Sequence, residues 1–195
     1  MQQNSITSFR FKYLYSNNVS NEISWRKYNE SRFNDRFKFQ LERYLGTWYE
    51  IARLPMKYQP EDSTDISAVY SLNEDSKVRV QNRCLDENQQ LDESIGEASI
   101  VDAENAKLEV SFLPEGFRWI PFTKGDYWVL KLDSNYQTAL VGEPNQKYLW
   151  ILHRQPTLDE ATKQEYLNYA QSIGYDLTDL IHTVHTGNKT AKISV

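Results

Sequence analysis

The 195-residue sequence contains one cysteine, so no disulfide can form within the chain and the fold must be stable without one. Seven glycines and six prolines are too few for a collagen-like or low-complexity chain. No apolar run approaches the roughly 20 residues that a membrane-spanning helix needs. The net charge of -5 argues against general nucleic-acid binding. These exclusions leave a globular protein, and its 39% of hydrophobic residues suffice for a packed core.

Positive charge and aromatic side chains gather in residues 1–38, where seven Lys or Arg stand against three Asp or Glu. Phe9, Phe11, Tyr13 and Tyr15 alternate as on a strand edge, and a basic, aromatic composition suits a membrane surface. The plainer interpretation is an Asn- and Ser-rich terminal tail, and we favour it. Residues 1–38 are therefore taken as an N-terminal extension outside the functional centre.

From residue 41 onward, short β-type runs alternate with turn signals. Strands are predicted over 48–54, 64–72, 77–85, 93–101, 106–113, 126–132, 136–142 and 147–153. The polar turns 73–76, 102–105 and 133–135 are tight, whereas longer connections lie between them. In an up-and-down meander, alternate connections share one end. The sequence thus predicts an all-β, eight-stranded antiparallel barrel with a closed base and a looped mouth.

Alternation within the predicted strands separates inward from outward side chains. Gly96 and Ala98 share the inward phase of the fourth strand, where small side chains would leave space inside the barrel. The sixth strand is apolar on both faces. We expect Tyr127 and Val129 inside, and Trp128 outside against a helix or a partner.

One helix is predicted after the strands, packed on the outside of the barrel. Thr157 can cap its N-terminus, and Glu160 completes a capping box. Apolar residues from Leu158 to Ile173 form a stripe for packing, and Gly174 is a natural stop. Residues 180–184 fit one further strand at the sheet edge. The predicted barrel with its helix covers residues 39–187, and residues 188–195 form a tail.

Three segments carry a family resemblance. The run 44–53, YLGTWYEIAR, resembles the Gly-x-Trp signature of lipocalins, in particular the bacterial outer-membrane lipocalins and their apolipoprotein D-like relatives. The runs 125–130, GDYWVL, and 148–154, YLWILHR, resemble the second and third lipocalin blocks. The resemblance extends over residues 39–185. It implies the same barrel, with Trp48 at the closed end, Arg154 lying over it, and Gly46 allowing the chain to turn into the first strand.

The resemblance implies binding and carriage of a small hydrophobic molecule, such as a fatty acid, a lysophospholipid or a similar membrane lipid. An apolar wall would hold the acyl chain, and polar groups near the mouth would orient a head group. The same positions could instead fill the barrel as core. The candidate wall residues are Val69, Val80, Asn82, Ala98, Val110, Phe112, Tyr127, Val129, Tyr148 and Trp150.

Two long loops are expected at the mouth. In this family the loop containing residues 56–59 would act as a lid. The loop 114–124 carries Trp119 and Phe122, an apolar tip suited to peripheral membrane contact or to a homodimer, although it could also fold over the mouth as a plug. We favour the interaction role.

Two alternatives to a carrier remain. Some lipocalins are enzymes with a thiol in the barrel, and Cys84 has the inward phase, but nothing in the sequence places a base or cation beside it. A filled-barrel interaction or stress protein is the second alternative. His182 and His185 fall on opposite faces of a predicted strand, so no metal site is expected, and no cofactor motif is recognised.

The first residues of the sequence bear on the cellular compartment in which we expect the protein. The first residues show neither an apolar stretch of signal-peptide type nor an early cysteine for a lipid anchor. This predicts a cytoplasmic protein. The alternative, if the true start differs, is the outer membrane or periplasm, as in the bacterial relatives.

Overall fold

The computed structural model describes residues 39–187 except residues 58, 76, 105 and 113–124, all within the unit Phe37–Val195. Its strands are β1 (Gly46–Arg53), β2 (Thr64–Leu72), β3 (Val78–Leu85), β4 (Leu91–Asp102), β5 (Lys107–Ser111), β6 (Gly125–Leu132), β7 (Thr138–Gly142), β8 (Leu149–His153) and β9 (Ile181–His182). Its helices are α2 (Leu41–Tyr44) and α3 (Glu160–Ser172). None of the described helices is long and apolar enough to cross a membrane.

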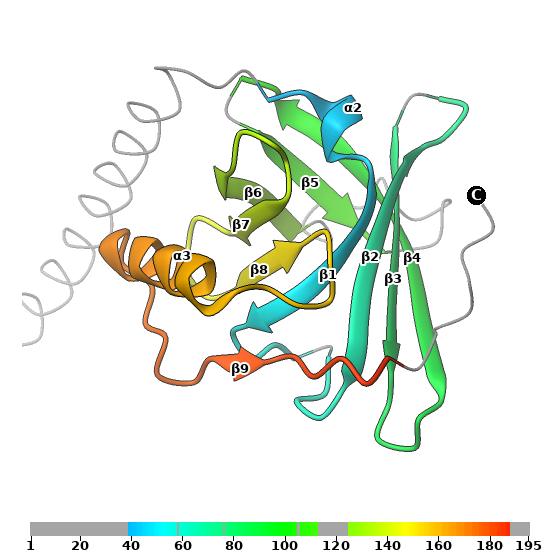
Figure 1. Cartoon of the computed structure of the whole chain (residues 1–195). Helices are drawn as coiled ribbons and strands as arrows, with labels where there is room; N and C mark the ends of the chain where they lie inside the picture. The colour runs from blue at the N-terminus through cyan, green and yellow to red at the C-terminus, as the bar shows by residue number, and fades with distance from the viewer. Residues whose placement is uncertain (1–38, 58, 76, 105, 113–124, 188–195) are drawn as a thin grey trace, which may run out of the picture. The chain divides into compact units, whose positions relative to one another are not determined.

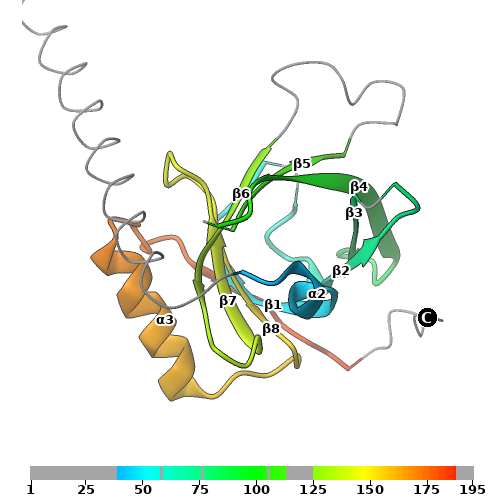
Figure 2. The ribbon, with the colours of Figure 1, turned by 90° about the horizontal axis from the view of Figure 1, so that it is seen from above.

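The first eight strands form a closed antiparallel barrel, as the sequence predicted (Figure 1). Consecutive strands pair in chain order from β2 to β8, β8 pairs with β1, and β1 pairs back with β2. The base lies at α2, where the Arg43 side chain donates to the carbonyl of Ser134 in the tight turn between β6 and β7 (3.0 Å). Seen along the barrel, α2 sits over this end (Figure 2).

A short connection joins α2 to β1 at Gly46. Its φ of +96° lies in the left-handed region that favours glycine. An added Cβ there would also stand 3.4 Å from the Arg154 guanidinium. The glycine therefore lets the chain turn from the base into the first strand beside Arg154.

Helix α3 packs on the outside of the barrel, over β7 and its neighbours (Figures 1 and 2). The Tyr166 hydroxyl donates to the Thr138 carbonyl on β7 (2.9 Å), and Leu167 and Ala170 are buried beside it. All five residues of β7 are buried, because its inner face meets the barrel interior and its outer face meets the helix. The predicted Thr157 cap is wrong: Asp159 is the N-cap and accepts from the Thr162 amide.

The C-terminal segment completes the barrel wall between β1 and β2. The first half of β1 pairs with β2, whereas Ala52 and Arg53 pair with β9 on the same edge. Beyond β9, the Thr183 amide donates to the Ile51 carbonyl (3.0 Å), and the Asp65 amide donates to the Val184 carbonyl (2.9 Å). Residues 181–186 thus bridge the two strands where they diverge toward the mouth. We call this segment the seam.

Candidate functional site

The base of the barrel is closed by an arginine lying across a tryptophan. Arg154 stands 3.8 Å from the centroid of the Trp48 ring, the arrangement that the family resemblance implied. Its guanidinium donates to the carbonyls of Thr47 (2.8 Å), Tyr136 (3.1 Å), Arg43 and Tyr44. One side chain therefore ties α2, β1 and the turn before β7 together, which makes the base a rigid structure.

Three tyrosine side chains meet just above this base. The Tyr127 hydroxyl contacts those of Tyr44 (2.8 Å) and Tyr70 (2.9 Å). Burial raises the pKa of Tyr70 to about 12 and raises the pKa of the other two well above the usual range. All three hydroxyls are therefore protonated at neutral pH. We call Tyr44, Tyr70 and Tyr127 the floor tyrosines.

The wall above the floor is built from inward-facing side chains. Residues paired directly across neighbouring strands share a face, so Tyr70, Val80 and Gly96 mark the inside of β2, β3 and β4. The same register places Ala98 with Val110, and Val129 with Trp150 through Val141. Tyr127 and Val129 face inward, and Trp128 lies outside under the Lys107 ammonium. Both positions match the predicted phase of the sixth strand.

Nine of the ten predicted wall residues have the inward phase: Val80, Asn82, Ala98, Val110, Phe112, Tyr127, Val129, Tyr148 and Trp150. Val69 does not. It pairs with Thr47 and Gln81 on the outer face of β2, between the inward-facing Ala68 and Tyr70. The prediction that Val69 lines the wall is therefore wrong, because side chains alternate along β2 and Val69 faces away from the side of Ala68 and Tyr70.

Phe112 occupies the space that Gly96 leaves. A Cβ at Gly96 would lie 2.7 Å from the Phe112 ring, so the ring packs directly on the glycine inside the barrel. The sequence analysis expected Gly96 to leave empty space inside the barrel. Instead, the aromatic ring of Phe112 occupies that space. The Phe112 side chain is nevertheless 46% exposed.

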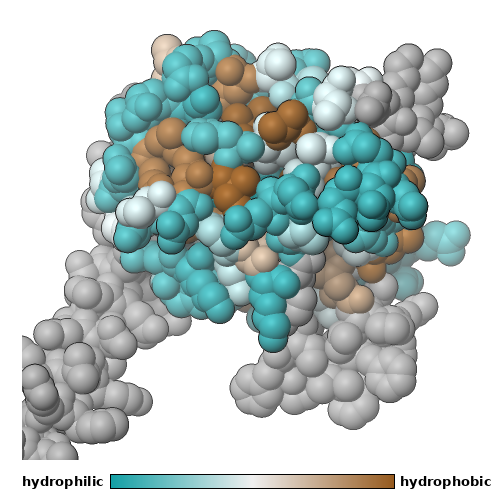
Figure 3. Space-filling model, turned by 90° about the horizontal axis from the view of Figure 1, so that it is seen from below, coloured by the Kyte–Doolittle hydropathy of each residue, from teal (hydrophilic) through white to brown (hydrophobic). Residues whose placement is uncertain are grey.

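Between Val78 and Asn82 on β3, and between Ala98 and Ser94 on β4, the inward-facing positions become more exposed toward the mouth. On β3 and β4, the pair Val78 and Ala98 is buried, whereas Asn82 is half-buried and its partner Ser94 is exposed. Seen from the mouth end, hydrophobic residues reach the surface in patches framed by hydrophilic ones (Figure 3). On these two strands, the inward-facing positions nearest the mouth are therefore the more exposed ones.

A buried ion pair lies on the inside of the wall toward the mouth. A bulge in β1 between Glu50 and Ala52 lets both Glu50 and Arg53 face inward, opposite Leu152 and Trp150 of β8. Arg53 Nη1 contacts Glu50 Oε1 at 2.9 Å, and Arg53 Nη2 donates to the Pro60 carbonyl at 2.6 Å. The Arg53 side chain is fully buried, and its Nε has no hydrogen-bond partner among the described residues.

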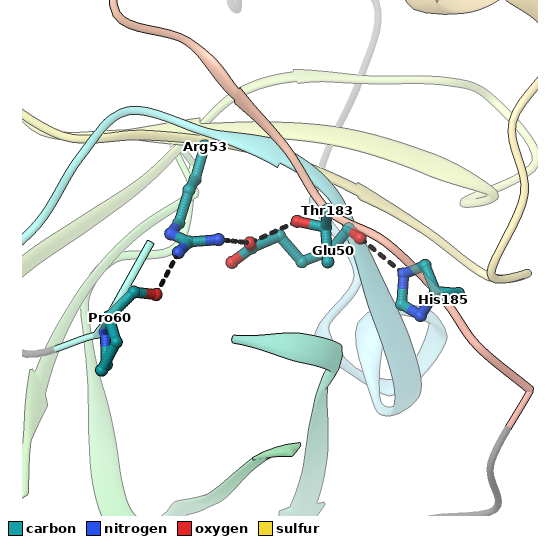
Figure 4. A network of polar contacts seen from close by, with 5 residues as sticks. All are labelled: Glu50, Arg53, Pro60, Thr183 and His185. Carbon is teal, nitrogen blue, oxygen red and sulfur yellow. Dashed lines mark hydrogen bonds and ion pairs between the residues drawn. The ribbon is translucent and has the colours of Figure 1, made fainter. Parts of the chain in front are cut away.

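The seam completes this network (Figure 4). The Thr183 hydroxyl donates to the same Glu50 oxygen (2.6 Å), and His185 Nε2 donates to the Glu50 carbonyl (2.8 Å). Burial raises the pKa of the Glu50 carboxyl, although Arg53 and Thr183 oppose the shift. The Glu50–Arg53 pair therefore links the barrel interior to the seam. The contacts from Arg53 and Thr183 favour the ionised form of the Glu50 carboxyl.

Cys84 lies on the inward face of β3 near the mouth, in phase with Asn82. Burial raises the pKa of its thiol, so the protonated and poorly nucleophilic form is favoured. The Cys84 residue is half-buried. Within the described part of the chain, no three His, Cys, Asp or Glu side chains gather as a metal site would require.

Several predictions concern residues outside the described ranges. Residues 1–38, the loop 114–124 with Trp119 and Phe122, and the tail 188–195 fall there, as does Tyr58 of the mouth loop. The described structure in turn adds groups that were not singled out as site residues. Glu50 and Arg53 are charged residues in an otherwise apolar strand, and this was a sequence signal for a functional or structural role. Tyr44 and Tyr70 gave no such signal, because buried tyrosines are common in an ordinary core.

A closed eight-stranded barrel, capped at one end and lined by inward-facing apolar side chains, either is filled by those side chains or holds one small molecule in its interior. The lipocalin-like domain family matches residues 39–185, and the chain belongs to this family. Its members bind small hydrophobic molecules.

Three relatives illustrate the similarity. The chain is 39% identical over 145 residues to temperature-induced lipocalin-1 of Arabidopsis thaliana (73% of this chain, 77% of that protein). It is 38% identical over 152 residues to the outer membrane lipoprotein Blc of Escherichia coli K12 (77% and 81%). It is 32% identical over 152 residues to apolipoprotein D of Mus musculus (74% and 76%).

Two solved structures share the fold at low sequence identity. Insecticyanin from the tobacco hornworm Manduca sexta superimposes with a TM-score of 0.58 at 21% identity, covering 75% of this chain and 80% of that one. Apocrustacyanin C1 gives 0.61 at 14% identity, covering 80% and 85%. These similarities establish the barrel architecture.

Proposed function

We propose that this protein binds and carries a single-chain membrane lipid, a fatty acid or a lysophospholipid, inside the barrel. The observation that carries the proposal is the set of inward-facing apolar residues Val80, Ala98, Val110 and Val129 in a barrel closed at its base, with more exposed inward positions, Asn82 and Ser94, toward the mouth. Two relatives are named an outer membrane lipoprotein and an apolipoprotein, names that connect those proteins with lipid.

The energetics of such a ligand are favourable. Burying the roughly 14 methylenes of a palmitoyl chain contributes about 11 kcal/mol, at about 0.8 kcal/mol for each. Lost translational freedom and chain ordering cost at least about 4 kcal/mol. The remainder corresponds to a dissociation constant in the micromolar range.

The test is lipid extraction and mass analysis of gently purified protein, followed by titration with palmitate and lysophosphatidylcholine monitored by tryptophan fluorescence. Val110→Trp fills the interior and should abolish saturable binding. Val69→Trp places the same side chain on the outer face of β2 and should leave binding intact. Absence of both co-purified lipid and saturable titration in the native protein would contradict the proposal and favour a filled barrel.

An interaction role for the loop 114–124 belongs to the same proposal. Carriage of a membrane lipid requires transfer to or from a bilayer, and Trp119 and Phe122 have the chemistry of a membrane-contacting or dimer-forming tip. The double substitution Trp119→Ser and Phe122→Ser should reduce vesicle partitioning or shift the oligomeric state. Unchanged values of both would contradict this role.

A further inference from the structure

The floor tyrosines carry one more hydroxyl proton than their contacts use. Three hydroxyls supply three protons, but only two oxygen–oxygen contacts join them, both through Tyr127. Tyr44 and Tyr70 have no other hydroxyl contact among the described residues. One phenolic O–H in this buried cluster therefore has no acceptor among the described residues, and such a group lowers its free energy by finding one.

Tyr127 is the hydroxyl placed to make this extra bond. A hydroxyl has one proton to donate and two lone pairs that accept. When Tyr44 and Tyr70 both donate to Tyr127, its lone pairs are used and its own proton remains for a third partner. As a whole residue Tyr127 is half-buried, whereas Tyr44 is 1% and Tyr70 is 5% exposed, and its hydroxyl lies between the other two.

The charge at the floor favours an anionic partner. The Arg154 guanidinium donates to four backbone carbonyls, and no carboxylate pairs with it among the described residues. Its positive charge acts on all three floor tyrosines. At the mouth the situation is the opposite, because Glu50 already neutralises Arg53 at 2.9 Å. A second carboxylate placed there would meet the negative charge of the first.

We propose that the floor binds an anionic oxygen, so that a fatty acid lies with its carboxylate on the Tyr127 hydroxyl and its alkyl chain directed toward the mouth. This inference rests on the proposed function and gives it an orientation. The chain would then run past Val80 and Val110 and end among the accessible aromatic rings of Phe112 and Trp150. Because the Tyr127 hydroxyl stays protonated, it can donate to the carboxylate throughout the neutral range.

The orientation is tested with palmitate labelled with ¹³C at either end, bound to the full-length protein. Carbon NMR spectra are recorded while a soluble gadolinium chelate is added as a relaxation agent. The methyl-end signal is expected to broaden before the carboxyl signal, since the methyl end lies nearer the mouth. A carboxyl signal that broadens first, or equally, overturns the proposal and indicates a head group at the mouth beside Arg53 or in solvent.

Substitutions supply an independent readout. Tyr127→Phe removes the donor and should weaken palmitate binding by about tenfold or more, the effect of losing a hydrogen bond to a charged group. Tyr70→Phe leaves the Tyr127 proton in place and should change affinity less than threefold. Tyr166→Phe, on the outer helix, is the matched control and should have no effect. Equal affinities of Tyr127→Phe and the native protein would overturn the proposal.

The two levels of inference fail in different ways. If the native protein binds neither palmitate nor lysophosphatidylcholine, the proposed function and the orientation are both wrong. If palmitate binds with its carboxyl end exposed to the chelate, only the orientation is wrong.

Discussion

Replacing Arg53 by methionine tests the buried ion pair of the barrel wall. Arg53 is fully buried and Glu50 is 3% exposed, so the variant leaves a carboxylate in the interior, where the Thr183 hydroxyl is its remaining side-chain donor among the described residues. Removing one partner of a buried pair costs about 3–5 kcal/mol, because the other charge stays desolvated. For a domain of this size, the melting temperature should fall by roughly 10 °C.

The loss should depend on pH in a defined direction. Burial raises the folded-state pKa of the Glu50 carboxyl above its unfolded value, and without Arg53 that pKa rises further. A carboxyl group whose pKa is higher in the folded than in the unfolded protein stabilises the fold when it is protonated. This stabilisation is complete below the unfolded-state pKa, and it is lost as the pH rises through the folded-state pKa. Arg53→Met should therefore be much less stable than the native protein at pH 8, and the gap should narrow toward pH 5.

The assay is urea unfolding at both pH values, followed by tryptophan fluorescence. Arg79→Met, on the outer face of β3, is the control and should change the free energy of unfolding by less than about 0.5 kcal/mol. Adding Glu50→Gln to Arg53→Met should recover part of the loss, because no net charge then remains buried. A variant as stable as the native protein at pH 8 would show that water reaches the carboxylate and would refute the reasoning.

Three further outcomes can be checked by thermal unfolding. Arg154→Met removes the cation over Trp48 and its bonds to carbonyls, and should cost about 3 kcal/mol; a loss below 1 would contradict a structural role. Gly96→Val should cost about 1–3 kcal/mol, because the new side chain meets both the Phe112 ring and the Ser111 carbonyl, and Phe112→Ala should relieve only the part of that cost that comes from the ring. Asp159→Ala should cost about 1 kcal/mol through the lost cap of α3, unlike a neutral change at Thr157.

The strands could be predicted because each one carries its own evidence. Inner and outer residues alternate along β3, and tight polar turns mark where β2, β4 and β6 end. Strand β6 is apolar on both faces, so alternation alone did not distinguish its inner from its outer side. Tyr127 and Val129 nevertheless face inward as predicted, and the Lys107 ammonium lies over the outward-facing Trp128. Local sequence was sufficient wherever one residue period held throughout a strand.

The parts that escaped prediction depend on departures from that period or on distant partners. The bulge in β1 places Glu50 and Arg53 on one face, although residues three apart in a regular strand face opposite ways. The floor tyrosines come from α2, β2 and β6, so only the closed barrel brings their hydroxyls together. Val69 is the one predicted wall residue that the register of β2 assigns to the outer face.

The seam has a consequence for how the chain is made. The contacts that complete the wall join Glu50 to residues 183 and 185, more than 130 positions later. A ribosome that has released β1 and β2 must synthesise nearly the whole barrel before these partners emerge. Until then, the diverging edges of both strands stay open, and unpaired strand edges invite association with other chains. The nascent protein should therefore depend on chaperone protection late in its synthesis, and shortening the chain to residue 180 should favour aggregation over folding.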